Sequence, residues 1–285
     1  MKNKIKTKIF LDSGDPADTK KIKKIFSSLN GQTTNPSLIA KNPQVIKKIK
    51  EGKKFSSEEL IQLYKKIVRK IAKEIPKGSI SIEVYADNNT TSDEILNACR
   101  KFSSWISNAH IKIPITKEGL KAAEQAVKEG INVNMTLCFS QKQAAAVYSA
   151  TKGSKKGQVF ISPFIGRLDD IGINGVDLIA NILKMYKKGD GHVEVLAASI
   201  RNLGHLLYCF NLKCDIVTVP AKVLKEWSET NFNTPNGNKN KQKLKKLKYD
   251  NNISIDSLWK SVNIKNKLTD QGIKKFCDDW NNLIK

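Results

Sequence analysis

The chain has 285 residues, of which 40% are hydrophobic and 27% charged, the balance of a soluble globular protein rather than of a disordered or membrane protein. No apolar run approaches the roughly 20 residues that a membrane-spanning helix needs, and the N-terminus lacks the apolar stretch of a signal peptide, so we expect a cytoplasmic location and no membrane partner. The five cysteines form no CxxC pair and the three histidines show no paired spacing, which argues against disulfides and against a metal site.

The formal net charge is +23, because 50 lysines and arginines face 27 acidic residues. Such a charge attracts polyanions, so binding of nucleic acid is one hypothesis. The lysines are spread along the whole chain without interleaved aromatic residues, however, and we therefore expect no dedicated nucleic-acid partner. The same electrostatic field would attract a small anionic substrate.

Eight short segments rich in β-branched and apolar residues are each followed by a stretch with helical periodicity. In chain order they are Lys8 to Asp12, Gly31 to Thr34, Ser79 to Tyr85, Ala109 to Ile113, Ile131 to Thr136, Val159 to Ser162, Val193 to Ala197 and Asp215 to Val219. Strands that alternate with helices form a parallel sheet. Eight such units predict an α/β fold, a single (β/α)8 TIM barrel over residues 1–285. An open doubly wound sheet is the alternative, but residues 12–16 lack the Gly-rich phosphate loop that such sheets carry after the first strand.

Two segments fall outside this repeat. Residues 228–252 carry Asn, Thr, Pro and Gly and then six lysines between Lys239 and Lys248, which indicates a solvated basic loop insertion with a frayed helix. Residues 264–283 resume helical spacing and predict an extra C-terminal helix. Ile273, Phe276 and Trp280 would share one face of this helix and dock on the barrel or on a neighbouring subunit. We expect a homo-oligomer in which Phe276 and Trp280 form an intersubunit contact.

Polar residues stand at the ends of the predicted strands. In a parallel barrel the C-terminal ends of the strands converge on one mouth, where the catalytic groups lie. The residues at these ends are Asp12, Thr33, Thr34, Asn35, Glu83, Lys112, Asn134, Thr136, Ser162, Arg167, Ser199 and Arg201. Any one of them could be a helix cap or a surface residue, but their convergence in one mouth predicts an active site.

Lys112 is the candidate nucleophile of this predicted active site. It is flanked by Ile111 and Ile113, so it points into the barrel if the two isoleucines face the helices. Its amine could then attack a ketone carbonyl. Asp12 and Glu83 in the same mouth could exchange protons with the intermediates, and the arginines at the far rim could bind a phosphate group.

Four motifs at these strand ends resemble the transaldolase family of class I aldolases. They are Thr33 to Leu38, Ile111 to Pro114 with Thr116 and Gly119, Ser162 to Asp170, and Ala197 to Arg201. The likeness runs from about Lys8 to Leu224 and returns in Leu268 to Trp280. It implies a (β/α)8 barrel that works without metal or cofactor and forms homo-oligomers. Residues 151–157 and 228–252 do not match the shortest family members, which leaves the oligomeric state open.

The resemblance also implies a role for each residue of the mouth. Lys112 is similar to the lysine that forms a Schiff base, and Asp12 resembles the acid/base carboxylate that assists cleavage and formation of the C–C bond. Glu83 and Thr136 look like the pair that positions the catalytic water. The implied substrate-binding residues are Asn35, Thr33, Asn134, Ser162 and Phe164 around a dihydroxyacetone unit, and Arg167, Ser199 and Arg201 around a phosphate.

The implied reaction belongs to the pentose phosphate pathway. A dihydroxyacetone unit passes from sedoheptulose 7-phosphate or fructose 6-phosphate to glyceraldehyde 3-phosphate or erythrose 4-phosphate. The alternative within the family is the fructose-6-phosphate aldolase branch, a lyase that releases free dihydroxyacetone. Its members typically have Gln where this chain has Glu83 and Tyr where it has Phe164, and the run from Asn134 to Thr136 is also of the transaldolase kind. Transfer is therefore favoured over aldol cleavage.

Overall fold

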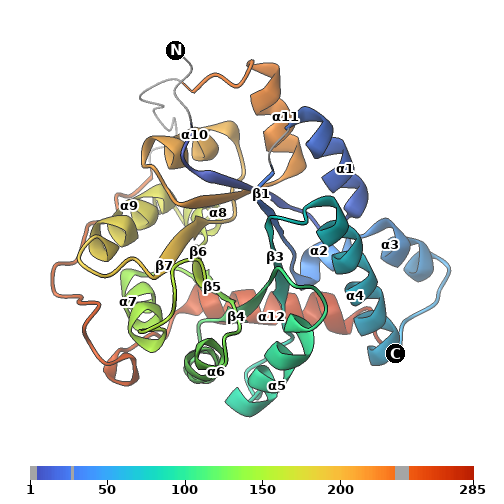
Figure 1. The fold of residues 1–285 in the computed structure, drawn as a ribbon, viewed down its shortest axis with the longest axis horizontal. Helices are drawn as coiled ribbons and strands as arrows, with labels where there is room; N and C mark the ends of the chain where they lie inside the picture. Colours follow the sequence, from blue (N-terminus) through green and yellow to red (C-terminus); the bar gives the residue numbers. More distant parts are fainter. Residues whose placement is uncertain (1–4, 27–28, 235–243) are drawn as a thin grey trace.

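A closed barrel of eight parallel strands forms the centre of the computed structural model, which describes residues 5–26, 29–234 and 244–285 (Figure 1). The strands are β1 (Lys8–Asp12), β2 (Gly31–Thr33), β3 (Ser79–Glu83), β4 (Ala109–Pro114), β5 (Val133–Cys138), β6 (Val159–Pro163), β7 (Val193–Ala197) and β8 (Ile216–Val219). Each strand pairs with its neighbours in chain order, and β1 pairs with β8 to close the barrel. The predicted (β/α)8 barrel is confirmed.

Helices surround the barrel on all sides in Figure 1. They are α1 (Pro16–Ile25), α2 (Pro36–Ala40), α3 (Pro43–Lys50), α4 (Ser57–Glu74), α5 (Ser92–Ser103), α6 (Lys117–Lys128), α7 (Gln141–Ala150), α8 (Ile165–Asp169), α9 (Gly175–Tyr186), α10 (Leu203–Asn211), α11 (Ala221–Glu229), the 3-10 helix η1 (Trp259–Ser261) and α12 (Lys267–Asn281). Several begin at a side-chain cap that the sequence encodes: Thr116 accepts the backbone N–H of Gly119 at the start of α6, which satisfies a donor that the helix itself leaves free.

Alternation along β4 divides the apolar and polar side chains between the two faces of the barrel wall. Ile113 faces α6, because a Cβ placed on Gly119 would lie 3.2 Å from its Cγ2 atom. Since neighbouring side chains of a strand point to opposite faces, Lys112 points into the barrel, as predicted. In the strand register Lys112 lies between Glu83 of β3 and Asn134 of β5.

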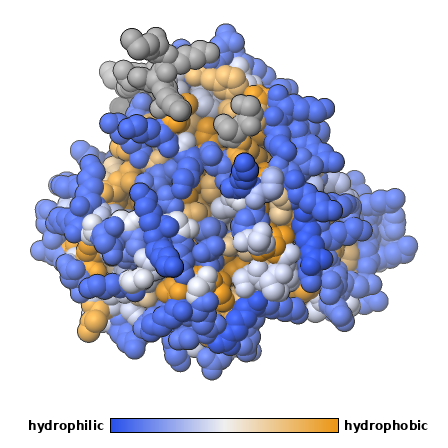
Figure 2. Space-filling model, viewed as in Figure 1, coloured by the Kyte–Doolittle hydropathy of each residue, from blue (hydrophilic) through white to orange (hydrophobic). Residues whose placement is uncertain are grey.

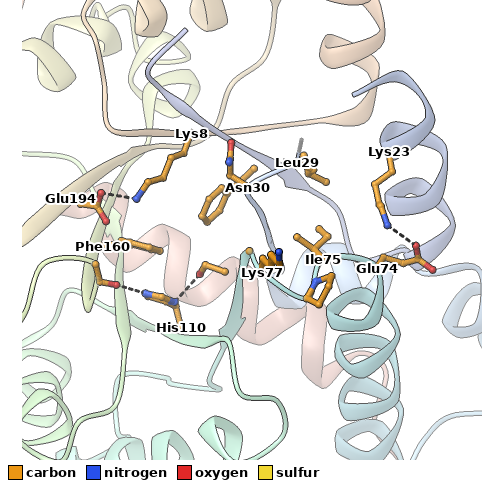
Figure 3. Close-up of a pocket in the computed structure, with 15 residues that line it drawn as sticks. Lys8, Lys23, Leu29, Asn30, Glu74, Ile75, Lys77, His110, Phe160 and Glu194 are labelled. Atoms are coloured by element: carbon orange, nitrogen blue, oxygen red, sulfur yellow. Dashed lines mark hydrogen bonds and ion pairs between the residues drawn. The ribbon is translucent and has the colours of Figure 1, made fainter. Parts of the chain in front are cut away.

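The N-terminal end of the barrel holds a packed histidine rather than a reactive one. The His110 ring stacks on Phe160 with the ring centroids 4.0 Å apart, and its two nitrogens hydrogen-bond Ser79 and the Gly157 carbonyl (Figure 3). Burial lowers the pKa of His110 to about 4. A pocket of about 470 Å³ opens here, rimmed by ion pairs such as that of Lys8 with Glu194, and it contains no residue of the predicted active site.

The C-terminal helix α12 crosses the opposite end of the barrel, behind the strands in Figure 1 and beside α2. Its first turn is attached to the barrel by Thr269, whose hydroxyl donates to the Leu137 carbonyl in β5. Phe276 and Trp280 are only 7% and 6% exposed against their own barrel. Of the two predicted docking surfaces, these rings therefore pack on the barrel, and an intersubunit role of the helix stays a prediction.

The basic segment is only partly described, because Lys239, Lys241 and Lys243 lie outside the described residues. From Leu244 onward the predicted frayed helix is absent, and the chain instead forms an extended strap over α9. Lys245 pairs with Ile173, and Leu247 exchanges hydrogen bonds with two side chains of α9.

Hydrophilic residues cover most of the face seen in Figure 2, with apolar residues showing between them near the centre. Among the helices of the described residues, none is long and apolar enough to span a bilayer.

Candidate active site

The C-terminal ends of the strands surround a cavity of about 470 Å³, which we call the mouth. Of the twelve residues to which the resemblance assigns a catalytic or substrate-binding role, eight line it: Asp12, Thr33, Asn35, Lys112, Ser162, Phe164, Arg167 and Ser199. Glu83, Asn134 and Thr136 lie behind this lining and are buried. Arg201 is exposed at the rim and does not line the cavity.

The Lys112 amine is held by two oxygens in the interior. Its Nζ atom lies 2.7 Å from Glu83 Oε2 and donates to the Thr34 carbonyl at 3.2 Å. The two side chains of this ion pair are 4% and 3% exposed. Burial raises the pKa of the Glu83 carboxyl, and the neighbouring Lys112 opposes that rise. The Glu83 carboxyl is thus within hydrogen-bonding reach of the Lys112 amine, inside the barrel.

Asp12 is the second carboxylate of the mouth. Thr33 donates a hydrogen bond to its Oδ1 atom at 2.8 Å, and the Thr33 hydroxyl in turn meets that of Thr218. Burial raises the pKa of Asp12, opposed by Lys112 and by the hydrogen bond from Thr33. A carboxylate with a raised pKa is a stronger base than an ordinary aspartate, which suits transfer of a proton to and from a hydroxyl.

A tyrosine that the sequence analysis did not single out supports Glu83 from behind. The Tyr64 hydroxyl, on α4, accepts the backbone N–H of Glu83 at 3.0 Å and lies 2.6 Å from the Thr34 hydroxyl. Burial raises the pKa of Tyr64, so it stays a neutral hydrogen-bonding group. On β5 the Thr136 hydroxyl is buried and has no hydrogen-bond partner among the described residues. Thr136 itself does not line the mouth.

The predicted amides have different roles. Asn134 is fully buried, donates to Ser81 at 3.0 Å and accepts the hydroxyl of Ser162 at 2.7 Å. Asn35 caps helix α2, because its Oδ1 atom accepts the backbone N–H of Leu38. The cap occupies the oxygen of Asn35 and leaves its amide nitrogen for the mouth. Asn35 is therefore both a helix cap and a lining residue.

The predicted phosphate-binding residues are brought together only in part. Arg167 of α8 lines the mouth, and burial and the nearby Arg201 lower its pKa. Ser199 adopts a left-handed backbone conformation with φ of 58°, an uncommon state for a residue other than glycine. Arg201 forms a two-pronged ion pair with Asp170, with distances of 2.9 and 2.6 Å. As the structure stands, its guanidinium is directed to that carboxylate and not to the cavity.

Gly166 allows α8, which carries Arg167, to pack against the turn that carries Ser199 and Arg201. A Cβ placed on Gly166 would lie 2.6 Å from the Ser199 carbonyl oxygen and 2.5 Å from Arg201 Cγ. Only glycine therefore lets α8 pack this closely against the turn after β7.

Comparison with known proteins agrees with this geometry. Residues 9–285 match the profile of the family described as Transaldolase/Fructose-6-phosphate aldolase. The chain belongs to this family. A probable transaldolase of Dehalococcoides mccartyi is 33% identical over 278 residues, which cover 98% of this chain and 100% of that protein. A probable transaldolase of Brucella ovis is 34% identical over 268 residues, with 93% and 94% covered. The resemblance predicted from the motifs is confirmed, and the chain is an enzyme of the transaldolase type.

Several residues of this transaldolase-type mouth were missed by sequence reasoning. They are Ser37 and Lys41 at α2, Thr218 of β8, and Lys275, Phe276 and Asp279 of α12. Thr218 could have been found, because it is the polar residue near the end of an otherwise apolar strand. Those on α12 could not, because no spacing in the sequence relates that helix to the ends of the strands.

Proposed function

We propose that this enzyme is a transaldolase that carries a dihydroxyacetone unit on Lys112. The donor would be sedoheptulose 7-phosphate or fructose 6-phosphate and the acceptor glyceraldehyde 3-phosphate or erythrose 4-phosphate, the exchange of the pentose phosphate pathway. One observation carries the proposal: a lysine amine lies inside the barrel, 2.7 Å from one carboxylate, in a cavity that a second carboxylate, Asp12, also lines.

The first half of the reaction follows from these three groups. Lys112 passes a proton to Glu83, and the free amine attacks C2 of the ketose. The carbinolamine loses water to give an iminium, with Glu83 and Thr136 handling the proton through a water molecule. The iminium accepts the electrons of the C3–C4 bond while the C4 hydroxyl gives its proton to Asp12. That bond breaks, the aldose phosphate leaves, and an enamine of three carbons remains on Lys112.

The second half reverses these steps on another aldehyde. The enamine carbon C3 attacks the carbonyl carbon of the acceptor aldose phosphate, and Asp12 returns its proton to the new hydroxyl. Hydrolysis of the iminium then releases the product ketose. Until the acceptor arrives, Asn35, Asn134 and Ser162 would hold the hydroxyls of the three-carbon unit, and the apolar Phe164 ring offers no proton to the enamine.

The phosphate group would lie at Arg167 and Ser199. Arg201 can join them only by leaving Asp170, and an ion pair that is half-exposed on both sides resists this by about 1 kcal/mol or less. We further propose that phosphosugars are the enzyme's partners and that it acts in the cytoplasm as a homo-oligomer.

Chemical trapping tests the proposal directly. Borohydride added with fructose 6-phosphate should reduce the iminium and attach the three-carbon unit to Lys112, detected by mass spectrometry of the peptide. Lys112→Met should abolish both the adduct and the formation of glyceraldehyde 3-phosphate in the presence of erythrose 4-phosphate. Lys117→Met, at an exposed lysine of the next helix, is the matched control and should keep both. An adduct on another lysine, or activity in Lys112→Met, would refute the proposal.

The same assay separates transfer from aldol cleavage. Glyceraldehyde 3-phosphate formed only in the presence of the acceptor indicates a transaldolase. Its formation at a comparable rate without the acceptor, together with free dihydroxyacetone, would indicate the aldolase branch of the family.

A further inference from the structure

The cationic residues of the mouth are not those that the motifs alone indicate. Among the described residues, the cations that line the cavity are Lys41, Lys112, Arg167 and Lys275. Lys112 is engaged by Glu83 inside the barrel, and Arg201 is engaged by Asp170 at the rim. The phosphate end of a substrate would therefore meet Arg167 and a lysine that the proposed function has not yet used.

Helix α12 brings Lys275 to the Arg167 side of the mouth. Phe276, the next residue, has its ring 5.9 Å from the guanidinium carbon of Arg167. Asp279, one turn further along the helix, contributes to the electrostatic field at Arg167 and lies 2.6 Å from Lys275 Nζ. One face of α12 thus places an ammonium group on the same side of the cavity as the partly buried Arg167.

The two side chains of the Lys275–Asp279 ion pair differ in how tightly the surrounding structure holds them. The Asp279 side chain is 19% exposed and its second carboxylate oxygen accepts a hydrogen bond from Ser37 at α2, whereas Lys275 is 59% exposed. Asp279 is therefore fixed between two elements, while Lys275 has room to move. An ion pair of this exposure is weak, so a phosphate dianion can compete for the ammonium group, with which it forms a charge-assisted hydrogen bond.

We propose that Lys275 binds the phosphate group of the substrate together with Arg167, so that the C-terminal helix completes the phosphate site. The inference rests on the proposed function and adds to it a binding residue from outside the eight βα units. Lys275 acts on the end of the sugar remote from Lys112, so it contributes to binding of substrate and not to the chemistry of the imine.

Lys274 provides a matched control on the same helix. It forms the equivalent ion pair with Asp278, four residues along, but is 75% exposed and does not line the mouth. Lys275→Met and Lys274→Met therefore each remove one surface charge and one such pair of α12, and only the first change should affect a phosphate in the cavity.

Steady-state kinetics with fructose 6-phosphate and a saturating acceptor tests the proposal. Lys275→Met should raise KM for fructose 6-phosphate about tenfold, the loss expected for one charge-assisted contact, while kcat stays within about twofold because ground state and transition state use the contact equally. Inorganic phosphate should inhibit Lys275→Met more weakly than the unmodified enzyme. Lys274→Met should change neither quantity.

Other outcomes overturn the inference. Equal effects of Lys275→Met and Lys274→Met would mean that only the general charge of α12 matters, and a tenfold rise in KM in Lys41→Met alone would assign the contact to α2. Either result leaves the proposed function intact, provided that the unmodified enzyme still forms the borohydride adduct on Lys112. Failure of the unmodified enzyme to form that adduct would instead contradict the proposed function.

Discussion

At the scale of single residues, the buried carboxylate of Asp12 reduces the stability of the fold. Its pKa is raised above the ordinary value of 3.8 by burial, so the folded protein binds the proton more tightly than the unfolded chain does. The stability that this proton gives is complete below pH 3.8 and is lost as the pH rises through the raised pKa. Above that raised pKa, where Asp12 is ionised, its burial therefore destabilises the fold.

Asp12→Asn should accordingly separate stability from activity. We expect the variant to lose activity by about a hundredfold or more and to gain about 1 kcal/mol in free energy of unfolding at pH 7, with the gain shrinking as the pH falls. In the unmodified enzyme kcat/KM should fall toward acid pH as Asp12 becomes protonated. Urea unfolding at several pH values and a pH profile of kcat/KM measure these effects. A variant less stable than the unmodified enzyme at pH 7 would contradict this account.

In the proposed reaction, Phe164 affects whether the enamine is protonated and released. Its ring packs edge-to-face on Phe139 with centroids 5.6 Å apart and lines the mouth beside Ser162. Phe164→Tyr adds a hydroxyl that can deliver a proton to the three-carbon unit, so release of free dihydroxyacetone without an acceptor should rise about tenfold relative to transfer. Phe164→Leu, which alters the ring without adding a proton donor, should not show this shift. Dihydroxyacetone measured with and without erythrose 4-phosphate decides between them.

At the scale of elements, α12 is attached to the barrel by a buried polar contact. The Thr269 hydroxyl donates to the Leu137 carbonyl at 2.9 Å and accepts from Gln143 Nε2 at 2.7 Å. Thr269→Val leaves both partners without a hydrogen bond, which should lower the free energy of unfolding by about 1–3 kcal/mol. Thr269→Ser keeps the hydroxyl and should cost less. Urea unfolding of the two variants gives the difference, and equal losses would mean that packing of the methyl group, not the hydrogen bond, attaches the helix.

The same helix marks the limit of what the sequence could predict. The strands were predictable because each is a short apolar run, and most of the mouth followed because the strand ends of a parallel barrel must converge. The apolar stripe of α12 predicted a docking face but not which surface it would cover. The sequence therefore could not predict that Lys275 and Asp279 line the mouth. Likewise, nothing local in the sequence indicates that Arg201 pairs with Asp170, because the two residues are 31 positions apart.

At the scale of the whole molecule, the net charge of +23 acts on every anion that approaches. A phosphosugar is drawn toward such a field over distances comparable with the Debye length, which is about 30 Å at 0.01 M salt and about 8 Å at 0.15 M. Substrate capture should therefore be stronger at low salt. Nucleic acid should be attracted for the same reason, without any dedicated site.

Salt titration distinguishes these two consequences of the charge. We expect KM for fructose 6-phosphate to rise severalfold between about 0.01 and 0.15 M salt and then to level off, because Arg167 is partly buried and buried charges are screened less. Binding of duplex DNA, measured by fluorescence anisotropy, should instead fall continuously and vanish near physiological salt, as expected of contacts made only to the phosphate backbone. DNA binding that persists there would support a dedicated nucleic-acid function, and a KM independent of salt would mean that the charge plays no part in substrate capture.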